Sequence, residues 1–229
     1  MSGAQREILP VGPPVDATPA QRPGPVTLTG RYGRVERLAP HHGASLWEAL
    51  HGHDAIWTYL PAGPFPNVVA FSYWLGECIA LDSPYFYAIV DPGGKAVGMS
   101  ALMEIRPPMR VIEVGHIIYS PALQRTPLAT EAQFLLAQYA FEMLGYRRYE
   151  WKCNALNAPS RQAALRYGFE FEGIFRHHMI VKGRSRDTAW FSMLASEWSA
   201  RKAAFERWLA PENFDQDGRQ KASLTSFNE

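Results

Sequence analysis

Three strand patterns in succession, between residues 85 and 119, lead through a short turn into the most regular amphipathic helix pattern of the chain. That helix pattern covers residues 128–144, with apolar residues at the i, i+4, i+7 and i+8 positions, and Gly145 stands where such a helix stops. The turn sequences Asp91-Pro92-Gly93-Gly94 and Pro107-Pro108 separate the three strands, which predicts an antiparallel meander. The chain therefore combines an antiparallel sheet with helices.

The rest of the chain also alternates between strand and helix patterns, without an internal repeat. We predict two short strands within 26–38, helices over 41–51 and 68–81, a strand over 148–153, a helix over 158–167, a hairpin of 169–181 with 187–194, and a last helix over about 196–209. This order predicts an α+β fold in which helices flank a mixed, mostly antiparallel central sheet. We expect a single domain over residues 26–210.

The two ends of the chain differ in composition from this domain. Residues 1–25 contain six prolines and no aromatic residue, so we predict a disordered leader. Residues 211–229 are polar with scattered apolar residues, and we read them as a C-terminal tail that lies on the surface or is loose.

Charge and cysteine content exclude several classes of function. With 23 Lys and Arg against 22 Asp and Glu, the net charge of +1 gives no long-range field that would attract nucleic acid or an anionic membrane. The two cysteines, Cys78 and Cys153, cannot form a disulfide framework, and we expect both to be buried. The pairs His41-His42 and His177-His178 have no third ligand at fitting spacing, so we predict no metal. We expect a cytoplasmic protein without a signal peptide or membrane span.

The most promising site for chemistry is the strand, turn and helix start within residues 113–132. A helix start presents unpaired N–H groups and a partial positive charge, which together favour an anion. Arg125 adds a charged donor, Thr126 is suited to cap the helix, and Pro127 is suited to the first helical position. Many such turns bind nothing, so these local features are compatible with either a binding site or a purely structural turn.

At this point the sequence resembles the GCN5-related N-acetyltransferase (GNAT) superfamily, within it the branch of ribosomal-protein N-terminal (alanine/serine) acetyltransferases. The resemblance rests on Gln124-Arg-Thr-Pro-Leu-Ala129, Leu144-Gly-Tyr-Arg-Arg-Tyr149, Asn157-Ala-Pro-Ser160, Tyr167-Gly-Phe169 and Phe171-Glu-Gly173, in the family's order and spacing. It implies acetyl-CoA as the donor and a primary amine as the acceptor, with direct attack of the amine on the thioester and no metal. Protein N-termini, polyamines, amino acids and drug amines all stay open as acceptors, and the oligomeric state is not indicated.

The resemblance also assigns residues to the coenzyme. The pyrophosphate would be bound by the loop and helix start, at Gln124, Arg125, Thr126, Leu128, Ala129 and Thr130. The pantetheine arm would lie along a strand edge at Ile117, Ile118 and Tyr119, with the amide of Asn157 opposite. Pro127 departs from the family's central glycine and removes one N–H donor from the loop.

Two groups are candidates for the base that deprotonates the attacking ammonium, namely Glu113 and His116. Strand alternation lets only one of them face the cleft unless a bulge intervenes, and we favour Glu113. Ala164 occupies the place of the family's general-acid tyrosine, and Ser160 is the alternative donor to the leaving thiolate. Because of the departures at 127 and 164, a catalytically silent acyl-CoA-binding or regulatory module is the competing hypothesis.

Overall fold

The computed structural model describes residues 9–228 and contains one eight-stranded sheet in the order β1-β2-β3-β4-β5-β6-β8-β7. The strands are β1 (Thr27–Thr29), β2 (Arg34–Arg37), β3 (Tyr85–Val90), β4 (Ala96–Arg106), β5 (Val111–Tyr119), β6 (Arg148–Asn154), β7 (Glu170–Val181) and β8 (Arg184–Leu194). Neighbouring strands are antiparallel except β5 and β6, which are parallel. The predicted α+β class and the mostly antiparallel, mixed sheet are confirmed.

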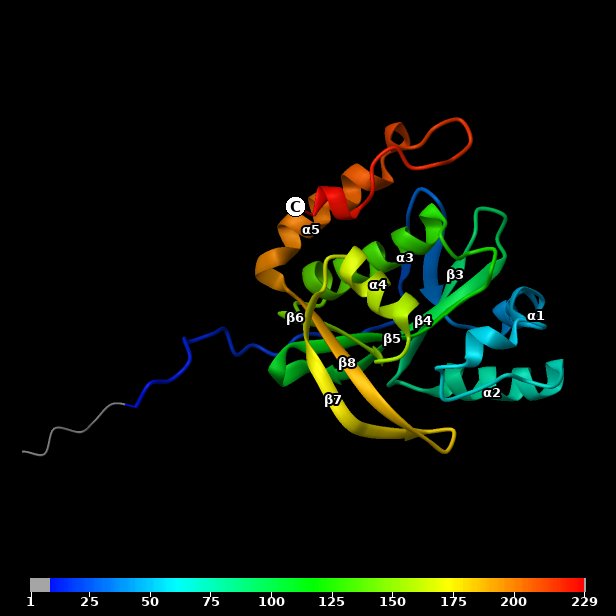
Figure 1. The fold of residues 1–229 in the computed structure, drawn as a ribbon, viewed down its shortest axis with the longest axis horizontal. Coiled ribbons are helices and arrows are strands. Elements are labelled where there is room, and N and C mark those ends of the chain that lie inside the picture. Colours follow the sequence, from blue (N-terminus) through cyan, green and yellow to red (C-terminus); the bar gives the residue numbers. More distant parts are fainter. Residues whose placement is uncertain (1–8, 229) are drawn as a thin grey trace, which may run out of the picture.

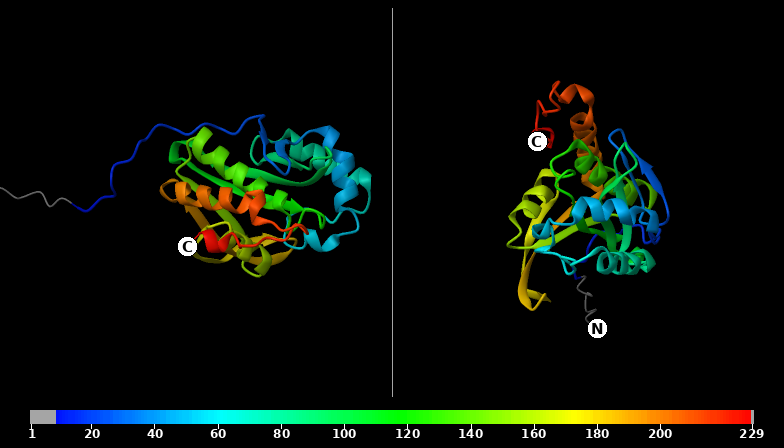
Figure 2. Two further views of the ribbon diagram at one scale, coloured as in Figure 1. Left: turned by 90° about the horizontal axis from the view of Figure 1, so that it is seen from above. Right: turned by 90° about the vertical axis from the view of Figure 1, so that its right-hand side faces the viewer.

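Helices cover the two faces of the sheet unequally (Figure 1). They are α1 (Gly43–Leu50), α2 (Val68–Ala80), α3 (Pro127–Gln138), α4 (Ala158–Arg166) and α5 (Ala195–Leu209), and α3 continues into a π-helical turn at Tyr139–Met143. One core packs α3 and α5 against the sheet, and a second packs α1 and α2 on the opposite face, against β3 and β4. Figure 2 shows α5 lying beside α3 on the first face. The second face is thus uncovered by helices over β6 and β8.

The sheet opens between its two parallel strands. The register of β5 with β6 runs from Val111 opposite Arg148 to Val114 opposite Trp151, and then ends. Both strands continue beyond this point, β5 to Tyr119 and β6 to Asn154. The facing edges of the two strands are therefore free of each other, which leaves backbone groups available to a ligand at this place.

Bulges in β4 and β5 interrupt the strand alternation close to this opening. In β5 the partner of Gly115 is Ala101 and the partner of Ile118 is Met99, so two residues lie opposite Ser100. His116 is one of the two and has a φ of +46°, a conformation that few non-glycine residues adopt. Glu104 in β4 also has a φ of +46°. Such bulges turn side chains toward positions that a regular strand cannot reach.

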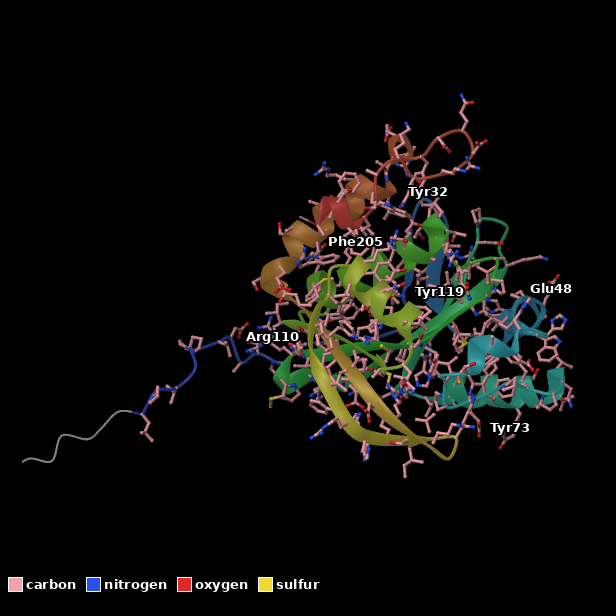
Figure 3. All side chains as sticks on the ribbon, in the orientation of Figure 1. Tyr32, Glu48, Tyr73, Arg110, Tyr119 and Phe205 are labelled. Carbon is pink, nitrogen blue, oxygen red and sulfur yellow. The ribbon has the colours of Figure 1, made fainter. Side chains whose placement is uncertain are left out.

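The N-terminal segment leaves the body as an extended chain, but part of it is bound to the body (Figure 1). The amides of Ala20 and Gln21 donate to the carbonyls of Pro107 and Leu144, and the carbonyl of Gly24 accepts from the hydroxyl of Tyr87. Arg110, marked in Figure 3 where the segment meets the body, pairs with Asp16 at 3.2 Å. Residues of the segment 16–24 thus contact the body before the boundary predicted at residue 25, because proline prevents regular ladders and not single hydrogen bonds. Residues 1–8 of the predicted leader lie outside the described residues.

The residues after α5 also pack on the body. Leu224 has no exposed surface, the side-chain amide of Gln220 accepts from the Trp208 indole at 2.8 Å, and Asn213 is buried. Residues 211–228 thus pack on the body, and Glu229, the last residue of the predicted tail, lies outside the described residues. Within residues 9–228, no helix has the length and apolar character needed to cross a membrane.

Candidate functional site

A cavity of about 450 Å³ lies where β5 and β6 separate, on the face that helices leave uncovered. Its walls come from β4, β5, β6 and the β7–β8 hairpin, from the start of α4, and from the loop at residues 56–61. The ammonium of Lys182 at the hairpin tip donates to the carbonyl of Trp57 at 2.8 Å, and the hydroxyl of Tyr59 donates to the carbonyl of Leu156 at 3.2 Å. These two bonds fix the loop to the opposite wall.

Glu113 is the buried carboxylate in this wall, with 5 % of its surface exposed. Its Oε2 lies 2.9 Å from Nζ of Lys152, whose ammonium also lies 3.0 Å from Oε2 of Glu150 and 4.0 Å from the centre of the Trp190 ring. Burial raises the pKa of Glu113 to about 7, because the attraction of Lys152 offsets the loss of hydration only in part. A carboxyl group with this pKa exchanges protons near neutral pH.

The charged groups behind Glu113 form a closed network on the same face. Glu150 accepts from Arg106 at 2.7 Å and from Arg148 at 2.8 Å, and Arg148 also pairs with Glu172. Burial acts to raise the pKa of Glu150, but the bonds from Arg148 and Lys152 outweigh it and hold this pKa below its usual range. Two carboxyl groups that share one lysine are thus shifted in opposite directions, and Glu113 is the one suited to proton transfer.

His116 lies in the same wall because of the bulge in β5. Its ring centre is 5.1 Å from that of Phe86, and burial together with the charge of Arg186 lowers its pKa. The imidazole is therefore neutral at neutral pH. Glu113 and His116 both line the cavity, which strand alternation allowed only if a bulge intervened.

The start of α4 supplies Asn157 and Ser160. The side chain of Asn157 accepts from the Ser160 amide at 3.2 Å and so caps the helix, while Oγ of Ser160 accepts from Nε1 of Trp151 at 3.1 Å. Both residues line the cavity. Because Trp151 supplies a donor to Oγ, the hydroxyl proton of Ser160 is left for an acceptor, which is the Cys153 sulfur next to it or an atom of a ligand.

The turn before α3 presents few but suitable donors. Oγ1 of Thr126 accepts from the Ala129 amide at 3.2 Å and donates to the Leu123 carbonyl at 2.7 Å, which caps the helix as predicted. Pro127 has no N–H, so the Leu128 amide is the first-turn donor left without a helical partner. Arg125 is exposed beside it, with a φ of +62°. This turn lies outside the lining of the cavity.

Comparison with known proteins shows which family this chain belongs to. The family model described as "Acetyltransferase (GNAT) domain" matches residues 34–170, more than half of the chain. The chain belongs to the GNAT acetyltransferase family. A GNAT structure from Brucella melitensis is 49 % identical, with a TM-score of 0.91 over 93 % of this chain and 98 % of that one. A GNAT-family structure from Chromobacterium violaceum ATCC 12472 is 41 % identical, with a TM-score of 0.79 over 86 % of this chain and 100 % of that one.

A curated relative matches a shorter part of the GNAT chain. It is the Bacillus subtilis (strain 168) protein named "Putative ribosomal N-acetyltransferase YdaF", 31 % identical over 109 residues. The match covers 48 % of this chain and 59 % of that protein, so the chain spans less than two thirds of it. The family membership makes the chain an acetyl-transferring enzyme, as the resemblance of its motifs indicated.

The sequence-predicted residues fall into two groups in this GNAT structure. The structure brings Glu113, His116, Ile117, Asn157 and Ser160 together around the cavity, and it places Gln124, Arg125 and Thr126 in the turn before α3. The others are available mainly through their backbone, because their side chains are in the interior or bonded there: Ile118, Tyr119, Leu128, Ala129 and Thr130. Figure 3 shows Tyr119 in the middle of the molecule, where its hydroxyl donates to the carbonyl of Ala129.

The cavity residues that sequence reasoning missed include two cations and an indole, those of Lys152, Arg186 and Trp190. Lys152 had a usable signal, since Arg148, Glu150 and Lys152 alternate with the apolar residues of their strand and so share one face. Arg186 had none, because the charged sequence 184–186 reads as part of the turn, whereas β8 begins at Arg184.

One cluster of possible metal ligands occurs within residues 9–228, formed by Glu36, His41 and His42. Its hydrogen bonds assign both ring nitrogens of His42: Nδ1 accepts from the Ala39 amide at 3.0 Å, so Nε2 carries the proton and lies 2.9 Å from Glu36. A metal would have to displace one of these bonds, so the cluster is explained as a buried hydrogen-bonded pair with His41 beside it.

Proposed function

We propose that this acetyltransferase transfers the acetyl group of acetyl-CoA to a primary amine by direct attack, with Glu113 as the base. The observation that carries the proposal is the end of the β5–β6 pairing at Val114 and Trp151, because it opens a cavity whose wall holds a carboxyl group with a pKa of about 7. Bound acetyl-CoA supplies a thioester, whose carbonyl carbon is open to attack by an amine.

The residues available for the coenzyme fit its shape and charge. The Leu128 amide and the Arg125 guanidinium would bind the pyrophosphate. Because Pro127 has no N–H, the loop offers one amide donor fewer, and more of the binding depends on Arg125. The free backbone edge of β5 around Ile117 would hold the pantetheine arm through amide bonds, with the side chain of Asn157 opposite. We expect the reaction in the cytoplasm, which is compatible with two free, buried cysteines.

Proton transfers divide between two residues of this chain. Glu113 accepts the proton of the attacking ammonium, directly or through water, and the amine nitrogen then forms a bond to the acetyl carbon as the carbon–sulfur bond breaks. The second N–H proton, lost as the amide forms, passes to the departing thiolate and gives the free thiol. Ser160 donates a hydrogen bond to the sulfur that departs as thiolate. Ala164 has no exposed surface, so the side chain at this position cannot act in the place of the family's tyrosine.

The test combines binding of acetyl-CoA with release of its thiol in the presence of a panel of amines. Equal amounts of free thiol and acetylated amine support the enzyme, whereas saturable binding with no release supports the silent acyl-CoA-binding module. Arg125→Ala should raise the coenzyme Kd about 10- to 100-fold, since a charged hydrogen bond contributes about 1.5–3 kcal/mol. Arg184→Ala, at an exposed arginine of the hairpin, is the matched control.

Glu113→Gln should separate binding from chemistry. We expect the coenzyme Kd to stay nearly constant and kcat to fall by roughly 10²–10⁴-fold, with partial recovery at high pH where more amine is already neutral. Full activity of Glu113→Gln at neutral pH together with inactive His116→Ala would transfer the role of base to His116.

A further inference from the structure

Two buried N–H groups in the cavity wall have no hydrogen-bond partner within residues 9–228. They are Nε of Arg186 and Nε1 of Trp190, two residues of β8 that both line the cavity. Buried donors in folded proteins are almost always paired, and leaving one unpaired shifts the folding equilibrium toward the unfolded state by roughly 5- to 150-fold. Two such donors in one wall indicate a place prepared for acceptor atoms of a ligand.

Arg186 also lacks a counterion, which sets it apart from the other cations on this face. Lys152, Arg148 and Arg106 each pair with a carboxylate, whereas no ion pair to Arg186 is formed in the described part of the chain. Burial lowers the pKa of its guanidinium, although the group stays charged. A half-buried charge of this kind is unfavourable until an anion reaches it.

Arg186 lies in the wall of the same cavity as the proposed base, Glu113. Arg186, Glu113 and His116 line the same cavity, the charge of Arg186 lowers the pKa of His116, and Glu113 acts to raise the pKa of Arg186. The exposed carboxylate of Glu104, in the bulge of β4, lies in the same wall. The cavity thus offers negative charge for an ammonium and, across a short span, positive charge for an anion.

We propose that the acceptor is an amine that also carries a free carboxylate, of the amino-acid type, and that Arg186 binds this carboxylate. The proposal rests on the proposed function, because it names the acceptor of that reaction. A guanidinium matches a carboxylate through two parallel N–H donors, and the Trp190 indole adds a third donor. A polyamine would place a second ammonium against Arg186, so this class is disfavoured by like charge.

The test compares matched acceptors on the full-length protein. Each of the standard amino acids, its amide and its decarboxylated amine are assayed for thiol release from acetyl-CoA, with pH profiles that correct for the different amine pKa values. For the best amino acid we expect kcat/KM at least tenfold above its amide. Arg186→Met should lower this kcat/KM about 10- to 100-fold, mainly through KM, and change that of the amide less than threefold.

Controls keep the result specific to Arg186. Arg184→Met changes an exposed arginine of the same strand outside the cavity, and it should leave kcat/KM unchanged for both the amino acid and its amide. Arg186→Met removes an unpaired buried charge and should therefore fold with an equal or higher Tm, and Arg186→Lys should give an intermediate loss because it keeps the charge without the two parallel donors. A raised coenzyme Kd in Arg186→Met would assign the arginine to the coenzyme and overturn the proposal.

Binding measured without turnover distinguishes this proposal from the proposed function. Calorimetric titration of the amino acid into protein saturated with CoA should give a Kd that Arg186→Met weakens at least tenfold. If this holds while no amine releases thiol, acetyl transfer fails and the carboxylate site stands. If amines without a carboxylate react as well as amino acids, and Arg186→Met affects all of them equally, acetyl transfer stands and the carboxylate site is refuted.

Discussion

The raised pKa of Glu113 predicts a stability change that can be measured without a substrate. The carboxyl group titrates at its ordinary 4.5 when the chain is unfolded and at about 7 when it is folded. Between these values the folded state binds more protons than the unfolded state. The contribution of Glu113 to the free energy of unfolding is therefore fully present below pH 4.5 and is lost as the pH rises through 7. At about 1.4 kcal/mol per pKa unit, the loss by pH 8 is ~3 kcal/mol.

Glu113→Gln removes this titration, since an amide stays neutral and can still accept a hydrogen bond from Lys152. We expect the free energies of unfolding of wild type and Glu113→Gln to be similar near pH 5, and the variant to be more stable by ~3 kcal/mol near pH 8. Urea denaturation at a series of pH values measures both curves. Over the same range the activity of the wild type should rise with an inflection near pH 7, so that activity is gained where stability is lost.

The neighbouring carboxylate provides a control of opposite sign. The pKa of Glu150 is held below its usual range, so its contribution to stability is present above pH 4.5 and is lost as the pH falls. Glu150→Gln should therefore destabilise the protein most at neutral and high pH, where it leaves Arg106 and Arg148 short of a partner. Parallel curves for wild type and Glu113→Gln from pH 5 to pH 9 would refute the assignment of a raised pKa to Glu113.

Three further predictions concern other parts of the chain. Removal of residues 1–25 should lower the Tm by about 2–10 °C, because the buried hydroxyl of Tyr87 loses its acceptor at Gly24, while removal of 1–15 should leave the Tm within about 1 °C; differential scanning calorimetry measures both. Ser160→Ala should reduce kcat by a similar factor at every pH, unlike Glu113→Gln, because the ionisation of the amine does not replace a donor to sulfur; a rate loss confined to low pH would contradict this role. Removal of residues after Ala210 should cost about 2–3 kcal/mol in urea denaturation, since the fully buried Leu224 is lost and Trp208 is uncovered; an unchanged midpoint would show that this packing contributes nothing.

The secondary structure was largely predictable because it follows from local periodicity. The strand pattern at 85–90 and the helix pattern at 68–81 match β3 and α2 within a residue, because a short continuous apolar run and a 3.6-residue repeat both follow from which side chains are buried. The bonds of residues 20–24 to the body carry no such signal. Each joins one backbone group to a partner far along the chain, and a proline-rich sequence reads in the same way whether these bonds exist or not.

The site was predictable to the extent that it depends on single residues, and not where it depends on register. The carboxylate at 113 and the imidazole at 116 were candidates by their chemistry, but alternation assigns positions three apart to opposite faces of a strand. Whether both reach one cavity depends on the pairing of β5 with β4, where residues 116 and 117 lie opposite Ser100 alone. The same extra residue leaves the backbone at Ile117 without a regular partner on β4, at the point where β6 has already separated from β5. One insertion in the register of β4 with β5 therefore turns His116 into the wall that holds Glu113, whereas the free edge of β5 results from the end of its pairing with β6.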